Sequence, residues 1–215
     1  MMLHVYGDSW AKGAELTNIE NPFAYHLSQL LKVNYINHGI EGASLGYILH
    51  NLISTVDKIE KNDMVVVIIP PDIRWYRITK EFLCCTLFLD DVEYKNSLNY
   101  LTIEWFIYHH NLFMCNIISL LKEKTNNFVL AHNYGKLIII DMFTNKIDKK
   151  YFLNDSSLTA LLGGKEWDQN YSNSKSEDGP CLTLFQGKYF EGKKSHPNDL
   201  GHRKIAELIY EYFTK

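Results

Sequence analysis

Two short polar motifs near opposite ends of the chain carry residue types suited to acyl transfer. Gly7-Asp8-Ser9 directly follows a short apolar run, and His196-Pro197 precedes the last amphipathic segment. A serine in a turn after a strand can present a nucleophilic hydroxyl, with backbone amides beside it for an oxyanion. A histidine held before a helix can take the proton from that hydroxyl. Each motif is also common as a plain turn or helix cap, so neither is specific by itself.

Two further loops contain groups that can stabilise negative charge. The loop 37–44 carries Gly42, and its backbone amides are suited to an oxyanion. The segment 70–77 combines Asp72 with Arg74, whose guanidinium suits a substrate carboxylate. The structural alternatives are a plain strand-to-helix connection for the first loop and a surface salt bridge for the second.

The same residue types give no indication of a metal site or a bound cofactor. His196 and His202 are six residues apart, which places them on different faces of a helix. None of the four cysteines has C-x-x-C spacing. We therefore expect chemistry that uses protein side chains only.

The elements that must position these loops alternate between strand and helix. Strands are expected over residues 3–6, 33–37, 64–69, 128–132 and 136–142. Helices are expected over residues 22–32, 44–59, 94–124, 156–162 and 198–213, with Asn21 and Ser44 as N-caps of the first two. The uninterrupted apolar run 64–69 is typical of a strand buried on both faces. This alternation predicts an α/β protein with three layers around a central parallel sheet.

Length and composition narrow the classes of protein. The 215 residues predict a single domain, residues 1–215, with a long polar excursion at about 154–194. A hydrophobic content of 46% excludes intrinsic disorder as the main state. A net charge of -3 offers no cationic field for nucleic acid. We expect a monomer by default.

The N-terminal residues indicate where the protein acts. They lack the basic start and long apolar core of a signal peptide, and no apolar run is long enough to span a bilayer. We therefore expect a cytoplasmic protein, or one not secreted by a classical signal, that does not bind membranes. A virion component fits the same observations.

The order of the four blocks resembles the SGNH (GDSL-type) hydrolases, a family of esterases, lipases and acyl-modifying enzymes with a flavodoxin-like α/β/α fold. The resemblance extends from Gly7 to the C-terminal helix. It implies that Ser9 is the nucleophile and supplies the first oxyanion amide, that Gly42 supplies the second, and that His196 is the general base.

Two positions depart from the pattern of this family. The acid that orients the imidazole usually stands three residues before the histidine, where this chain has Lys193. The third block usually reads Gly-x-Asn-Asp, and Asp72 stands in place of its Asn, where a carboxylate would repel an oxyanion. Arg74 is a candidate substitute donor. The candidate orienting acids elsewhere in the chain are Asp178, Glu191 and Asp199.

The leading hypothesis is a serine hydrolase that cleaves a small acyl ester, such as an O-acetyl group of a carbohydrate, through Ser9 and His196. The two departures support a second hypothesis, a catalytically degenerate module with the same fold that binds a glycan or a protein. An acyltransferase would use the same site. Outside this family, a Rossmann nucleotide-binding protein fits the alternation, but the first turn lacks G-x-G-x-x-G.

Overall fold

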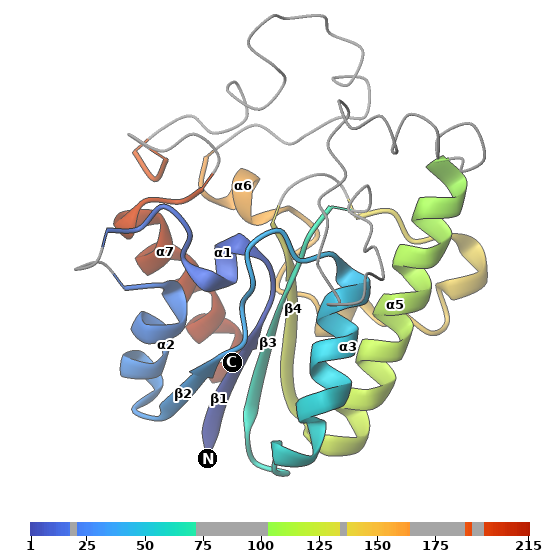
Figure 1. Cartoon of the computed structure of the whole chain (residues 1–215), viewed down its shortest axis with the longest axis horizontal. Coiled ribbons are helices and arrows are strands. Elements are labelled where there is room, and N and C mark those ends of the chain that lie inside the picture. Colours follow the sequence, from blue (N-terminus) through green and yellow to red (C-terminus); the bar gives the residue numbers. More distant parts are fainter. Residues whose placement is uncertain (18–20, 72–102, 134–136, 164–187, 191–195) are drawn as a thin grey trace, which may run out of the picture.

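A four-stranded parallel sheet forms the centre of the protein. The computed structural model describes residues 1–17, 21–71, 103–133, 137–163, 188–190 and 196–215. The strands lie in the order β2-β1-β3-β4, with every neighbouring pair parallel. Their bounds are β1 (Met2–Tyr6), β2 (Asn34–Asn37), β3 (Met64–Ile69) and β4 (Asn127–His132). All four carboxyl ends therefore lie at one edge of the sheet, which is the upper edge in Figure 1.

Helices cover both faces of this sheet. On one face lie α2 (Phe23–Leu31) and α7 (Asp199–Thr214), and on the other lie α3 (Leu45–Thr55) and α5 (Ile103–Lys124) (Figure 1). The short helices are α1 (Ser9–Lys12) and α6 (Leu158–Leu161), with single 3-10 turns at η1 (Val56–Lys58), η2 (Asp141–Phe143) and η3 (Lys149–Tyr151). The arrangement is a three-layer α/β/α fold, as expected from the alternation of elements.

Strand β3 shows why an all-apolar segment suits the centre of such a fold. Val65, Val67 and Ile69 pack into the core beneath α3 and α5. The alternating residues Val66 and Ile68 pack into the opposite core beneath α2 and α7. All five side chains are buried, because successive residues of a strand point to opposite faces and both faces are covered here.

The strand expected over residues 136–142 is wrong. Residues 137–140 have no regular structure, and the single turn η2 follows them. The side chain of Asn111 on α5 donates to the Ile138 carbonyl at 2.9 Å and accepts from the Ile140 amide at 3.2 Å. One buried amide therefore satisfies backbone groups that a sheet neighbour would otherwise pair, so the apolar run does not need to join the sheet.

The start of α2 also differs from the expectation. Its N-cap is Pro22 rather than Asn21, and Pro22 makes no side-chain capping bond. The Phe23 amide instead donates to Nδ1 of His202 on α7, at 3.2 Å. A partner from another helix thus satisfies an amide that a capping side chain usually takes. Ser44 does cap α3, as predicted, by accepting from the Tyr47 amide.

The remaining predicted elements agree closely with the structure. The helix expected over 44–59 ends at Thr55 and continues as η1, and the helix expected over 94–124 is described from Ile103 onward. Ser157 caps α6 and Asn198 caps α7. Of the excursion at 154–194, only residues 154–163 and 188–190 are described. Within the described residues, no helix has both the length and the apolar character needed to cross a bilayer.

Candidate active site

Ser9 begins helix α1, just beyond the carboxyl end of β1. The side chain of Asp8 caps this helix by accepting from the Trp10 amide at 3.0 Å, and its other oxygen accepts from Asn133 Nδ2 at 2.8 Å. Asp8 is fully buried, so both bonds are shielded from water. Ser9 itself is only 3% exposed. The Gly-Asp-Ser turn is therefore held from two sides, with the serine at the edge where the strands end.

Asn133 connects this turn to the far side of the sheet. It follows β4, and its amide donates to the Ile69 carbonyl at the end of β3, at 3.1 Å. Its own carbonyl accepts from both the amide and the hydroxyl of Thr159, on α6. Sequence reasoning missed Asn133. A polar residue directly after a buried strand is the signal that could have identified it.

The loop that carries Gly42 packs against the Ser9 turn. The Ile40 amide donates to the Gly7 carbonyl at 3.0 Å. The Asn37 side chain donates to the Ala11 carbonyl of α1 at 2.7 Å. The first and second sequence blocks are therefore bonded to each other.

Two glycines make this close packing possible. A Cβ atom on Gly39 would collide with the backbone of α1 at Lys12 and Ala11. Gly42 has a φ of 74°, a left-handed conformation that glycine adopts without steric strain. The loop can therefore approach α1 closely, as its bonds to the Gly7 and Ala11 carbonyls show.

His196 is held at the start of α7 by a rigid local structure. Asn198 caps the helix by accepting from the Gly201 amide at 3.0 Å, and its own amide donates to the Tyr189 carbonyl at 2.8 Å. A Cβ atom on Gly201 would lie 2.7 Å from both Pro197 Cβ and the Tyr189 carbonyl oxygen. The sequence His-Pro-Asn-x-x-Gly therefore fixes the backbone that carries the imidazole.

His196 contacts the loop that leaves the Ser9 helix. Its Nδ1 atom lies 3.2 Å from Oε2 of Glu15, with side-chain exposures of 14% for His196 and 38% for Glu15. The amides of Gly13 and Ala14 both donate to the Ser9 carbonyl and close the C-terminal end of α1 just before Glu15. The segment just after α1 therefore contacts the histidine from the opposite end of the chain.

Of the candidate orienting acids identified from sequence, the structure describes Asp199. Asp199 is bound elsewhere, at 2.8 Å from Arg203 Nε and 3.5 Å from His26 Nε2. Four of the predicted site residues lie outside the described residues: Asp72, Arg74, Asp178 and Glu191. Sequence reasoning also missed Glu15, because a contact between residues so far apart in the chain leaves no local pattern.

His132 and His110 lie near the same edge of the sheet. Burial lowers the pKa of His132, at the end of β4, to about 4, and the charge of His110 on α5 adds to this shift. The His132 ring is therefore neutral at pH 7. Within the described ranges, no group of three or more histidine, cysteine, aspartate or glutamate side chains is arranged to hold a metal ion.

Comparison with solved structures identifies proteins with a similar fold. No family model matches the chain, and no curated protein matches its sequence. A member of the lipolytic protein G-D-S-L family from Veillonella parvula is similar over 100% of this chain and 99% of its own, with a TM-score of 0.53 and 13% identity. An acetyl xylan esterase is similar over 98% of both chains, with a TM-score of 0.52 and 16% identity.

A two-domain esterase active on acetylated mannans is also similar, over 100% of this chain and 49% of its own, with a TM-score of 0.54 and 16% identity. At such low identities the similarity concerns the fold. The chain has the three-layer α/β/α fold of the GDSL (SGNH) hydrolases, which confirms the fold that its sequence implied.

Proposed function

We propose that this protein is a divergent SGNH-type serine hydrolase that cleaves a small acyl ester, with Ser9 as nucleophile and His196 as general base. One observation carries the proposal. His196 contacts the loop that leaves the Ser9 helix, although the two motifs come from opposite ends of the chain. The position of Ser9 at the carboxyl edge of the parallel sheet also supports the proposal, because ligands of open α/β folds bind at that edge.

The proposed reaction has two steps that share one base. Ser9 Oγ attacks the ester carbonyl carbon, its proton moves to Nε2 of His196, and the carbonyl π electrons move onto oxygen. Collapse of this oxyanion breaks the bond to the alkoxide, which takes the proton from His196 and leaves as an alcohol. Water then attacks the acyl-serine in the same way. The carboxylic acid leaves, and Ser9 regains its proton.

The backbone amides of Ser9 and Gly42 are the proposed donors to the oxyanion. The bonds between the Gly42 loop and the Ser9 turn support this role, because they fix the two amides relative to each other before substrate binds. Arg74 is the proposed third donor, in place of the Asn that other members of the family have where Asp72 stands. A guanidinium only donates, so it suits an oxyanion better than a carboxylate does.

A small acyl group is the substrate class we favour. The burial of Ser9 supports it, since a covered hydroxyl suits acetyl better than a long acyl chain. Two of the similar structures are an acetyl xylan esterase and an esterase active on acetylated mannans. A carbohydrate O-acetyl ester is therefore the proposed substrate. If an alcohol replaces water in the second step, the same site transfers the acyl group to it.

Labelling with a fluorophosphonate tests the nucleophile directly. We expect a covalent adduct on Ser9, located by mass spectrometry, together with turnover of p-nitrophenyl acetate and acetylated xylan. Ser9→Ala should lose both the adduct and the turnover. Ser54→Ala changes an exposed serine on α3 and should keep both. Full turnover in Ser9→Ala would disprove the assignment.

A catalytically degenerate binding module is the second candidate, and Lys193 and Asp72 are the observations that favour it. Such a module would bind a glycan or a protein partner without Ser9-dependent chemistry. A folded protein that neither labels nor turns over esters, yet binds acetylated xylan in calorimetry, would support this candidate over the hydrolase.

A further inference from the structure

The chain has no carboxylate three residues before His196, yet a carboxylate from elsewhere lies against its ring. Glu15 Oε2 is 3.2 Å from His196 Nδ1, within the range of an N–H···O hydrogen bond. We infer that Glu15 is the positioning residue of this histidine, in place of the acid that Lys193 displaces. The inference rests on the proposed function, and it assigns the orienting acid that the proposed catalytic site otherwise lacks.

The chemistry of a neutral imidazole gives this contact its meaning. Only one of the two ring nitrogens carries a proton, and the partner of one nitrogen decides the state of the other. With Nδ1–H donating to Glu15, the lone pair is on Nε2, where it can accept the proton of Ser9. When the ring becomes an imidazolium during attack, the Glu15 carboxylate stabilises its charge.

The local backbone is shaped to make this contact. Helix α1 ends at Gly13, and the Gly13 and Ala14 amides bond back to the Ser9 carbonyl. Glu15 then adopts a φ of 67°, a left-handed conformation that bulky side chains rarely adopt. The other described non-glycine residue with positive φ is Lys32, at the C-cap of α2, where this conformation is common. At Glu15, by contrast, the strained backbone coincides with a contact to the proposed base.

The other acids considered for this role are engaged by other residues. The two carboxylate oxygens of Asp199, the closest acid in sequence among the described candidates, are engaged by Arg203 and His26. Glu41, the nearest acid of the Gly42 loop, pairs with Lys12 at 3.6 Å and is 66% exposed. Glu41 is therefore a matched control, an acid of the same kind beside the same short helix.

The expected effect is smaller than in a fully buried triad. Loss of a buried orienting carboxylate slows a serine hydrolase by about 10⁴-fold. Glu15 is 38% exposed, so solvent screens its charge and can partly replace its hydrogen bond. We expect a loss in kcat of about 10- to 100-fold, since the geometry of Ser9 and its amides is untouched.

The kinetic test compares Glu15→Gln with Glu41→Gln on p-nitrophenyl acetate. Glu15→Gln should lower kcat by about 10- to 100-fold with KM unchanged within about twofold, because the residue acts through His196 and does not touch the substrate. Glu41→Gln should match wild type. Added formate should restore part of the activity of Glu15→Ala, which a purely structural role would not allow. A Glu15→Gln kcat within twofold of wild type would overturn the inference.

A second readout does not depend on turnover. The ¹⁵N chemical shifts of the His196 ring, assigned with His196→Gln, report which nitrogen carries the proton. We expect the Nδ1–H form in wild type and in Glu41→Gln, and a shift toward the other tautomer in Glu15→Ala. Unchanged ring shifts in Glu15→Ala would overturn the inference. If wild type shows no Ser9-dependent chemistry, the proposed function fails and this measurement decides the role of Glu15 separately.

Discussion

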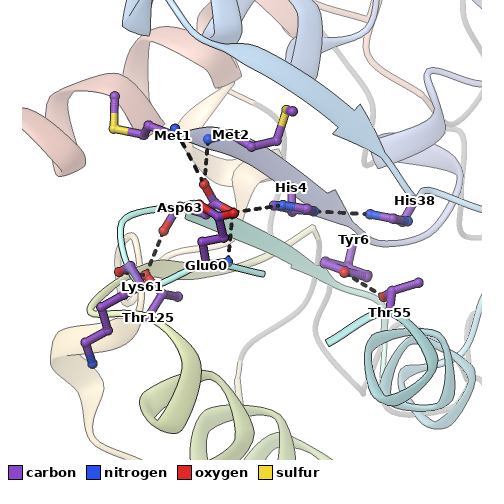
Figure 2. Close-up of polar contacts among 10 residues, drawn as sticks. All are labelled: Met1, Met2, His4, Tyr6, His38, Thr55, Glu60, Lys61, Asp63 and Thr125. Carbon is purple, nitrogen blue, oxygen red and sulfur yellow. Dashed lines mark hydrogen bonds and ion pairs between the residues drawn. The ribbon is translucent and has the colours of Figure 1, made fainter. Parts of the chain in front are cut away.

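Two contacts between a carboxylate and a histidine lie at opposite edges of the same sheet. At the carboxyl edge, Glu15 contacts His196 beside the Ser9 turn. Near the amino edge, Asp63 lies 3.4 Å from His4 Nε2 (Figure 2). On the other side of this ring, toward the carboxyl end of β2, Nε2 of His38 lies 3.4 Å from His4 Nδ1. We refer to Asp63, His4 and His38 as the lower network.

The two contacts differ in burial and in what surrounds them. In the lower network the side chains of Asp63 and His4 are 4% and 3% exposed. The Asp63 carboxylate accepts from the amides of Met2 and Glu60 (Figure 2). The Tyr6 ring stacks on His38 at 4.4 Å. Backbone amides therefore bind the Asp63 carboxylate, and the Tyr6 ring covers one face of His38.

The pKa shifts of His4 and Asp63 reflect the surroundings of the lower network. Burial lowers the pKa of His4 although the charge of Asp63 opposes the shift. Burial by itself would raise the pKa of Asp63, but the amides of Glu60 and Met2 outweigh it and hold that pKa below its ordinary value. The lower network thus pairs an ionised carboxylate with a neutral ring. On the proposed function, the contact at the carboxyl edge takes part in chemistry because that edge also carries Ser9.

The largest expected difference between the two regions is in catalysis. His196→Gln should lower kcat/KM for p-nitrophenyl acetate by about 10⁴-fold or more, because no base remains for Ser9. His4→Gln should leave kcat/KM of the folded protein within about threefold. Initial rates normalised to folded protein measure both. Equal losses of kcat/KM in the two variants would contradict the assignment of the base to His196.

Stability should show the opposite pattern. Asp63→Ala leaves the amides of Met2 and Glu60 without their acceptor, which should lower the free energy of unfolding by about 2–4 kcal/mol. Glu15→Ala should change it by less than about 1 kcal/mol, since its carboxylate is partly solvated. Urea unfolding at pH 7 compares the two. A larger loss in Glu15→Ala would reverse the assignment of roles.

Acid should weaken the lower network by a smaller amount. Burial, with the charges of His4 and Lys58, lowers the pKa of His38 to about 4 from its ordinary 6.5. The unfolded chain then binds the proton more readily, so stability falls as pH drops from about 6.5 toward 4. At pH 5 the loss should be about 1–2 kcal/mol, allowing for partial exposure. In urea unfolding, His38→Gln should lose less stability between pH 7 and pH 5 than wild type. His50→Gln, an exposed control, should retain the full dependence.

Local patterns predicted most of the fold and suggested both ends of the proposed site. The run Met64–Ile69 forms the buried strand that its apolar character predicted, and Ser44 caps α3 as predicted. Ser9 and His196 are proposed as site residues because a short motif marks each of them. These features depend on residues that are close in sequence.

Features set by contacts between distant segments escaped prediction. The apolar run 136–142 failed as a strand because Asn111, from α5, pairs with its backbone. Glu15 was missed because its approach to His196 depends on a left-handed residue after α1 and on the docking of α7. Asp199 looked suitable by its nearness in sequence, but Arg203 lies one helical turn along the same face and binds its carboxylate.

The docking of α7 has a consequence for when activity first arises during synthesis. The proposed base is residue 196 and the proposed nucleophile is residue 9, so about 10–40 s of translation separate them. Helix α7 completes the layer that α2 begins, through the stacking of His202 on Phe23. A nascent chain can therefore form most of its sheet and still lack the general base. On the proposed function, ester cleavage would report that the last helix has reached its place.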